Sequence, residues 1–171
     1  MPNLLSNLSE ISRIMGDDRD FLLRIVQPGL AGLMDGSVST LAPIFATAFA
    51  THNSHTVFLI GAAAAVGAGI SMAFSEGLSD DGELTGRGNP VFRGLVTGIM
   101  TFLGGFLHTL PFLIPNVHTA LLWAYLVVGV ELLVIAWIRF RYFKTSFALS
   151  CVQVILGGGL VFTAGVLIGS S

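Results

Sequence analysis

The chain has 171 residues, of which 53% are hydrophobic and only 11% are charged, and its mean hydropathy is +0.82. A soluble domain usually carries about twice that charged fraction, so the composition excludes a soluble globular protein and predicts a membrane protein. The formal net charge is −2, and the eight basic residues form no patch suited to nucleic acid, so no nucleic-acid partner is expected. The single cysteine, Cys151, has no partner for a disulfide.

The first 21 residues are expected to form a cytoplasmic segment outside the membrane. They lack the basic start and the unbroken apolar stretch of a cleavable signal peptide. Leu4, Leu8, Ile11 and Met15 share one helical face by their spacing, which favours a short helix lying on the membrane surface. The alternatives are a frayed tail or a linker to a part absent from this chain.

Residues 22–171 are predicted to form one membrane domain of five transmembrane helices. Each of five apolar segments is close to the ~20 residues that cross about 30 Å of hydrocarbon. The segments lie at about 28–50, 56–78, 92–114, 118–140 and 147–169. The expected fold class is therefore an all-α membrane protein that contacts the lipid bilayer along most of its length.

The basic residues predict the orientation of these helices. All eight Lys and Arg residues lie before the first segment, between the second and third, or around the end of the fourth. Because basic residues mark the cytoplasmic side, the N-terminus is predicted in the cytoplasm and the C-terminus outside. Five crossings also require the two ends to lie on opposite sides, which agrees with the charge pattern.

Small residues recur at four-residue intervals, a pattern that lets helices approach closely in lipid. The second segment has two such stripes, one of Gly61, Ala65, Gly69 and Ala73, and one of Ala63, Gly67, Ser71 and Ser75. Further pairs are Gly32 with Gly36, Gly94 with Gly98, and Gly165 with Gly169. The simple interpretation is packing within one chain. Because five helices make a thin wall around an aqueous path, a homodimer with the path near its interface is also predicted.

Three acidic residues, Asp35, Glu76 and Glu131, lie in or near the predicted hydrocarbon, where an ionised carboxylate is costly. Asp35 lies about two turns inside the first segment, and Ser39 follows one turn later on the same face. Pro43 has no N–H, so the carbonyl of Ser39 loses its helical partner. A carboxylate, a hydroxyl and a free carbonyl on one stripe suit a divalent cation or a relayed proton. Alternatively, Asp35 caps a neighbouring helix or pairs with an arginine.

Met72 and Glu76 lie four residues apart in the second segment, and Asp80 and Glu83 are expected to continue the same face as the helix leaves the membrane. A thioether beside carboxylates favours a transition metal, because magnesium and calcium sites are built from oxygen. The alternative for Met72 is core filling. The acidic run that includes Asp81 has the composition of a solvated turn, which would still attract cations to the cytoplasmic mouth.

Glu131 falls near the middle of the fourth segment, where burial disfavours the charged form, so it is a candidate proton carrier. A structural hydrogen bond to a neighbouring helix is the alternative. The four histidines, His52, His55, His108 and His118, map to the outer ends of the helices. Imidazole binds transition metals and titrates near neutral pH, so an exit site is conceivable, but water-facing loop histidines are the favoured interpretation.

Two motifs, "GLMDGSVST" from Gly32 and "SMAFSEGLS" from Ser71, resemble the paired signature of the vacuolar iron transporter family, "GLNDGLVST" and "SMAxGEYVS". The resemblance covers about residues 28–169. It implies a homodimer that moves ferrous iron, and often manganese, out of the cytoplasm in exchange for protons, without a permanently bound cofactor. It also implies that Asp35 and Met72 line the path and that Glu76 lies at its cytoplasmic entrance.

The sequence departs from this family pattern in several places. Met34 and Ser75 replace an asparagine and a glycine of the two motifs. The connection between the second and third segments is only about a dozen residues, whereas plant-like members insert a glutamate-rich metal-binding domain there. The chain most resembles the membrane half of a bacterial branch that fuses a ferritin-like domain to this unit. No Glu-x-x-His pair of such a domain occurs here, so iron storage and ferroxidase activity are not expected.

We therefore expect a secondary transporter rather than an enzyme, in a prokaryotic inner membrane. Asp35, Met72 and Glu76 are the expected metal ligands, with Ser39, Asp80 and Glu83 as weaker candidates, and Asp35 and Glu131 are the expected proton carriers. No nucleophile–base pair, zinc motif or phosphate loop stands out in the sequence. The rival hypothesis is a membrane assembly or anchoring protein whose acids serve helix packing.

Overall fold

The computed structural model describes residues 18–83 and 85–171, and helices dominate this part of the chain. No strand occurs among these residues, and five of their helical stretches are long and apolar enough to cross a membrane, which confirms the predicted fold class. The surface helix predicted for residues 1–21 lies almost wholly outside the described residues. Residues 18–21 are already part of the first membrane-spanning stretch.

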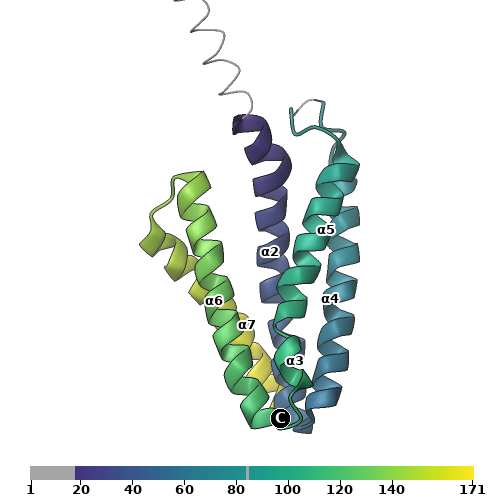
Figure 1. The fold of residues 1–171 in the computed structure, drawn as a ribbon, viewed down its shortest axis with the longest axis vertical. Helices are drawn as coiled ribbons and strands as arrows, with labels where there is room; N and C mark the ends of the chain where they lie inside the picture. The colour runs from purple at the N-terminus through teal and green to yellow at the C-terminus, as the bar shows by residue number, and fades with distance from the viewer. Residues whose placement is uncertain (1–17, 84) are drawn as a thin grey trace, which may run out of the picture.

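The first stretch, Asp18–Thr51, is one crossing made of several pieces. A π-helical turn, η1 (Leu22–Val26), leads into α2 (Gln27–Ser39), and α3 (Leu41–Thr51) follows after a break at Thr40 (Figure 1). Pro43 explains the break, because it cannot donate to the carbonyl of Ser39. The hydroxyl of Thr40 donates instead to the carbonyl of Gly36, 2.8 Å away, at the end of α2.

The other four crossings agree with the predicted segments except at one end. They are α4 (Ser54–Gly77), α5 (Pro90–Leu107), α6 (Val117–Phe143) and α7 (Phe147–Gly169). The third segment was predicted to continue to residue 114, but α5 ends at Leu107 and a short 3₁₀ helix, η2 (Leu110–Leu113), follows. Pro111 accounts for this early end, because its ring cannot donate to the carbonyl of Leu107.

An asparagine begins each of α4, α5 and α6. The side-chain oxygens of Asn53, Asn89 and Asn116 accept hydrogen bonds from backbone amides three residues later, at 3.0, 3.1 and 3.0 Å. Such N-caps satisfy amides that have no partner within the helix. Three of the four connections between crossings therefore end in a local signal that fixes the first turn of the next helix.

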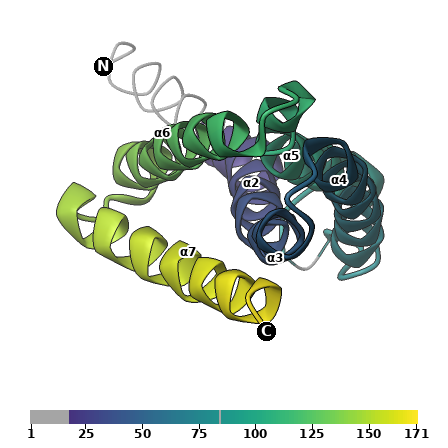
Figure 2. The ribbon, with the colours of Figure 1, turned by 90° about the horizontal axis from the view of Figure 1, so that it is seen from below.

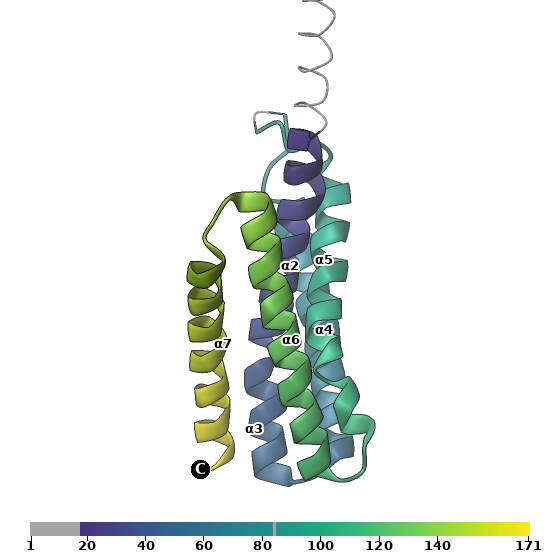
Figure 3. The same ribbon diagram turned by 60° about the vertical axis from the view of Figure 1, so that its left-hand side comes forward.

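Helix α5 lies between α2 and α4 and is in close backbone contact with both (Figures 1 and 2). A Cβ atom added at Gly36 would stand 2.0 Å from the carbonyl oxygen of Thr101, and one at Gly32 would stand 2.2 Å from that of Thr97. Only glycine allows this approach. Helix α7 stands at the edge of the bundle, apart from α2 near its start, and its last turns pack against α3 (Figures 2 and 3).

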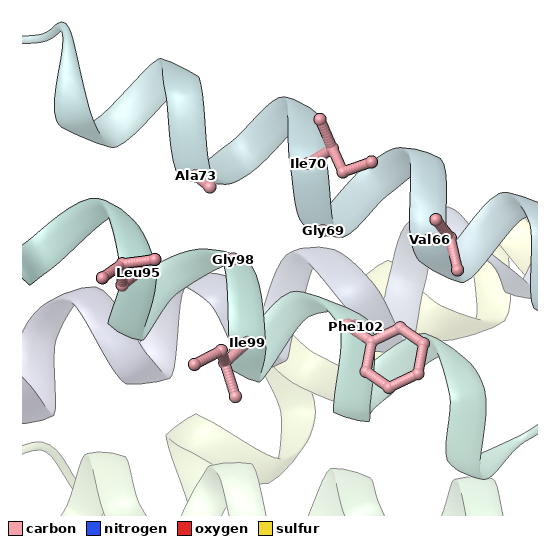
Figure 4. A pocket seen from close by; sticks show the side chains of 8 residues that line it. All are labelled: Val66, Gly69, Ile70, Ala73, Leu95, Gly98, Ile99 and Phe102. Carbon is pink, nitrogen blue, oxygen red and sulfur yellow. The ribbon is translucent and has the colours of Figure 1, made fainter. Parts of the chain in front are cut away.

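Most of the small-residue pairs serve packing within the chain, as the simple interpretation predicted. The stripe that contains Gly69 and Ala73 packs against Gly94 and Gly98 of α5, and Gly165 packs against α3. Between α4 and α5 this contact leaves an open groove of about 280 Å³, lined mainly by apolar side chains (Figure 4). Its lining offers no ligand for an ion, so the groove is no candidate for the path.

The second stripe of α4 remains uncovered by this chain. Ala63, Gly67, Ser71 and Ser75 are all exposed, and a Cβ atom added at Gly67 would meet no atom within 4 Å. The structure therefore separates the two stripes of α4: one packs within the chain, and the other is available to a partner.

All the basic residues in the described part of the chain gather at one end of the bundle. This basic end is defined by Arg19, Arg24, Arg87, Arg93, Arg139, Arg141 and Lys144. It comprises the start of the first crossing, the α4–α5 connection and the α6–α7 connection, which all lie at the top of Figure 1. The basic residues therefore lie at one end of the bundle, as the predicted topology requires. That this end faces the cytoplasm stays a prediction.

Candidate functional site

A buried polar cluster joins three helices in the interior of the bundle. The hydroxyl of Ser37 on α2 lies 2.6 Å from Glu131 Oε1 on α6, and Glu131 Oε2 contacts Nε2 of His108 at the end of α5. The exposed fractions of Ser37, Glu131 and His108 are 0%, 6% and 0%. A Cβ atom added at Gly104 would stand 3.1 Å from Glu131 Oε1, so a glycine at this position leaves room for the carboxylate.

The histidines differ from the sequence-based interpretation at one position. His52, His55 and His118 are exposed at helix ends, as predicted. His108 was expected to face water, and this is wrong, because the side chain is fully buried against Glu131. The early end of α5 turns His108 into the bundle, and Pro111 is the one feature of the sequence that could have indicated that end. Both alternatives for Glu131, a proton carrier and a contact to a neighbouring helix, stay open.

Glu76 lies in an ion-pair network at the basic end. One of its oxygens lies 2.6 Å from Arg87 Nη2 and 2.9 Å from Arg93 Nε. Asp80 binds the same two arginines, at 3.1 and 3.2 Å. Arg93 is fully buried, whereas Glu76 and Asp80 keep about a fifth of their side-chain surface exposed. In this structure arginines, rather than an open cavity, surround the predicted entrance carboxylate.

Asp80 and Glu83 were predicted to continue the face of α4, and this is wrong, because the connection after α4 is not helical. Helix α4 ends at Gly77, and Gly82, Gly86 and Gly88 then adopt left-handed backbone angles with φ of 81°, 68° and 73°. These glycines return the chain so that Asp80 faces the arginines. Glu83 is exposed and its backbone amide donates to Asp81 Oδ1, 3.0 Å away.

The pKa of Asp80 reflects this network. Burial alone would raise it, but the backbone hydrogen bond from Gly82 and the positive charge of Arg93 outweigh burial and lower the pKa below its ordinary value of 3.8. The hydroxyl of Thr85 and the charge of Arg87 act in the same direction. Asp80 is therefore ionised at neutral pH and forms part of a fixed charge cluster.

Asp35 differs from the other two acids because no partner holds it. The side chain is half-buried on α2, and its carboxylate makes no hydrogen bond or ion pair with any described residue. Neither alternative for Asp35, a cap or an arginine pair, is seen within residues 18–83 and 85–171. Ser39, one turn further on, is exposed beside the break that Pro43 causes, so its unpaired carbonyl lies on the same stretch of α2.

Met72 lies at nearly the same height in the bundle as Asp35. The Cβ positions of Gly36 on α2 and Gly69 on α4 contact the same turn of α5, at Thr101 and at Phe102. Asp35 and Met72 are one and three residues nearer the basic end than these glycines, so their heights differ by less than about one helical turn, ~5 Å. Helices α2 and α4 also contact each other, and Met72 is half-buried.

These residues do not form a complete metal site within one chain. No group of three or more His, Cys, Asp or Glu side chains in the described residues is arranged to hold a metal ion. Glu76 lies nearest the basic end, and Met72 and Asp35 lie deeper in the bundle on α4 and α2; their role as ligands stays a prediction. The roles of Arg87, Arg93 and His108 escaped sequence reasoning, since the arginines had been assigned only to topology.

The profile of the VIT family matches residues 75–170, which is more than half of the chain. The match begins in the last turn of α4 and runs to the end of α7. It therefore includes Glu76, His108 and Glu131, whereas Asp35 and Met72 lie outside it. Neither the curated proteins nor the solved structures contain a match to the chain.

Proposed function

The chain belongs to the VIT family of metal ion transporters, and on that premise we propose that it exports ferrous iron from the cytoplasm in exchange for protons. Manganese is proposed as a second substrate. The observation that carries the proposal is the state of Asp35, a carboxylate within an apolar crossing that lacks a partner among the described residues. Acids in membrane helices mark ion and proton pathways, because nothing else offsets the cost of placing them there.

The chemistry of the path supports iron-group metals. A hydrated dication must lose water to pass, and the carboxylate of Asp35 and the thioether of Met72 would replace part of that shell. Methionine sulfur is a soft ligand that favours transition metals over magnesium and calcium. Because a bound dication disfavours protonation of nearby acids, release of the metal outside would favour the uptake of a proton.

A homodimer would complete the ligand set that one chain lacks. The stripe of Ala63, Gly67, Ser71 and Ser75 is exposed and small, and such stripes let two helices approach closely in lipid. Asp35 and Met72 are only half-buried, so a second copy could bring two of each to one shared path. We propose a multi-pass protein of the prokaryotic inner membrane with the basic end in the cytoplasm.

The rival function, a membrane assembly or anchoring protein, is favoured by one observation. Glu76 pairs with two arginines, and Glu131 contacts a histidine and a serine, so two of the three acids already serve helix packing. For transport, Glu76 would have to exchange Arg87 for the metal. Asp35 separates the two functions, because a purely structural protein gives no reason for an acid without a partner.

Transport into proteoliposomes tests the proposal. Vesicles with an internal metal-sensitive dye would receive Fe²⁺, Mn²⁺ or Ca²⁺ outside, with wild type compared with Asp35→Asn and Met72→Leu. We expect Asp35→Asn to lower Fe²⁺ flux at least tenfold and Met72→Leu, which keeps the volume but removes the sulfur, to reduce the preference for Fe²⁺ over Ca²⁺. The matched controls are Asp18→Asn, an exposed acid, and Met34→Leu, which packs in an apolar cluster. Wild-type flux in Asp35→Asn would refute the proposal and favour the rival function.

A further inference from the structure

The buried cluster of His108, Glu131 and Ser37 contains two ionisable side chains in contact with each other. Glu131 Oε1 faces the Ser37 hydroxyl, Oε2 faces His108 Nε2, and both side chains of the ionisable pair are more than nine-tenths buried. Both ring nitrogens of His108 and Glu131 Oε2 are buried and form no hydrogen bond with a described residue, so Nε2 and Oε2 meet as a close contact of two ionisable groups. An imidazole that approaches a carboxylate through one nitrogen, with the other unpartnered among these residues, has the groups needed to pass a proton.

Among the described residues, no other charged side chain forms an ion pair with His108 or Glu131. Helix α3 and η2 contain no ionisable side chain. The remaining ionisable groups on the helices that surround the pair are Asp35 on α2, Arg93 on α5, His55 and Glu76 at the ends of α4, Tyr125, His118, Arg139, Arg141 and Tyr142 on α6, and Cys151 on α7.

Each of these groups lies elsewhere or has its own partners. Arg93 binds Glu76 and Asp80 at the basic end, and Arg139 donates to Gln153, 2.6 Å away. Tyr125 stacks on Phe45, with ring centroids 5.3 Å apart. Asp35 is two residues from Ser37, about 200° around α2, so it lies on the opposite side of the helix. With Glu131 ionised and one hydrogen on the His108 ring, the pair therefore has a charge of −1, and it becomes neutral only when it binds one further proton.

We propose that His108 and Glu131 form a one-proton site, separate from Asp35, that carries the proton exchanged for the metal. Ser37 is its positioning residue: its Oγ lies 2.6 Å from both Glu131 Oε1 and the carbonyl oxygen of Leu33, so donation to the carboxylate competes with donation within α2. This inference rests on the proposed proton-coupled export and adds to it the residues that hold the proton. It assigns His108 a role that neither the motifs nor the family match assigns.

The proton transfer balances within the pair. Starting from an ionised Glu131 and a neutral His108 with its hydrogen on Nε2, a proton from the side opposite the basic end binds Nδ1. The Nε2–H bond breaks as the hydrogen forms a bond to Glu131 Oε2, so the net charge of the pair goes from −1 to 0. The O–H bond of Glu131 then breaks as the proton leaves toward the basic end, which returns the charge of the pair to −1 with the ring hydrogen on Nδ1. Exchange of that hydrogen from Nδ1 to Nε2 restores the starting tautomer. A dication on the Asp35 side of α2 favours the −1 state, so metal binding expels the proton and metal release readmits it.

The test uses full-length protein in proteoliposomes with both a metal dye and a pH dye. We expect Glu131→Gln and His108→Gln to move Fe²⁺ down its gradient while the protons moved per metal fall at least tenfold. The double variant is expected to be no worse than either single one, because the two residues act as one unit. His118→Gln, an exposed histidine on the same helix as Glu131, is the matched control and is expected to keep wild-type coupling.

Several outcomes decide the matter. Wild-type proton movement per metal in Glu131→Gln overturns the inference. If Glu131→Gln does not fold, Ser37→Ala tests the inference instead, because it removes only one hydroxyl. We expect this variant to shift the pH profile of coupled flux. An unchanged profile overturns the inference. If wild type moves no metal, the proposed function fails, and infrared spectroscopy decides the proton site separately. A carboxylic acid band that titrates with pH and vanishes in Glu131→Gln supports the site, and its absence from wild type refutes it.

Discussion

The contact between α2 and α5 leads to a quantitative prediction, because Gly36→Ala places a methyl group where a backbone already lies. The added Cβ would be 2.0 Å from the carbonyl oxygen of Thr101 and 2.8 Å from its carbonyl carbon, whereas ordinary contact begins at 3.4 Å. The atoms in question are backbone atoms, so no rotamer change relieves the overlap, and the helices must separate by roughly 1 Å. A gap of about 0.5–1 Å already forfeits a quarter to a half of the dispersion energy between facing atoms.

Two opposing terms set the size of the effect. Overpacking costs about 1–3 kcal/mol, and a backbone overlap belongs at the upper end of that range. Alanine is better than glycine in a helix by about 1 kcal/mol, which offsets part of this cost. We expect Gly36→Ala to lower the free energy of unfolding by about 2 kcal/mol. Gly157→Ala on α7, where a Cβ would meet nothing within 4 Å, is expected to raise it by up to ~1 kcal/mol.

The assay is thermal and denaturant unfolding of the purified protein in detergent, followed by intrinsic fluorescence and size-exclusion chromatography. The two alanine variants change composition identically, so their difference of roughly 3 kcal/mol isolates the close helix contact from helix propensity. Gly36→Ala should also disturb proton coupling, because the next residue, Ser37, contacts Glu131. Equal stability of the two variants would show that α2 and α5 are not in backbone contact.

Three further predictions concern the basic end and a helix cap. Arg93→Met removes a buried guanidinium from Glu76, while Arg87 still binds that acid. We therefore expect the free energy of unfolding in the denaturant assay to fall by about 2–3 kcal/mol, less than the ~3–5 kcal/mol lost when a fully buried pair is broken. An unchanged free energy would contradict the network. Because the pKa of Asp80 is lowered in the folded state, its ionised carboxylate stabilises the fold fully above pH 3.8, and this stabilisation is lost as the pH falls below that value. Asp80→Asn should therefore flatten the acid limb of a curve of Tm against pH. An unchanged limb would refute this. Asn116→Ala should cost about 1 kcal/mol while Asn116→Asp keeps the cap, so equal Tm values for the two variants would argue against capping.

The crossings could be predicted because lipid imposes a simple requirement on the sequence. A helix must keep about 20 apolar residues to cross, and charged residues accumulate only between crossings, so composition alone places all five. Pro43 predicted the lost hydrogen bond at Ser39, but the first crossing was expected as one helix over about 28–50, and its division into α2 and α3 was not predicted. The end of α5 could not be predicted, because Pro111 lies within an apolar run, and such a proline is equally compatible with a kinked helix and with the end of a helix.

The polar contacts could not be predicted, since they join residues distant in the sequence. Ser37 and Glu131 are 94 positions apart, and their contact depends on how closely α2, α5 and α6 approach at Gly104. Arg93 is similar, because a basic residue at the start of an apolar helix indicates topology as readily as an ion pair. The sequence thus identified the acids of the bundle, but the groups that hold them depend on helix packing.

Asp35 and Glu131 lie on opposite sides of α2, close to the break at Thr40, and have different environments. Ser37 and Asp35 lie on opposite sides of α2, so the helix separates a paired, buried carboxylate on one side from an unpaired, half-buried one on the other. A continuous helix would resist any rearrangement that changes both sides together, whereas a crossing already broken by Pro43 can tilt α2 relative to α3 without losing another backbone hydrogen bond. Such a tilt would alter the contact of Ser37 with Glu131 and the exposure of Asp35 in one movement. If Asp35 binds the metal and the pair of His108 and Glu131 binds the proton, as proposed above, one tilt of α2 would couple the two binding events.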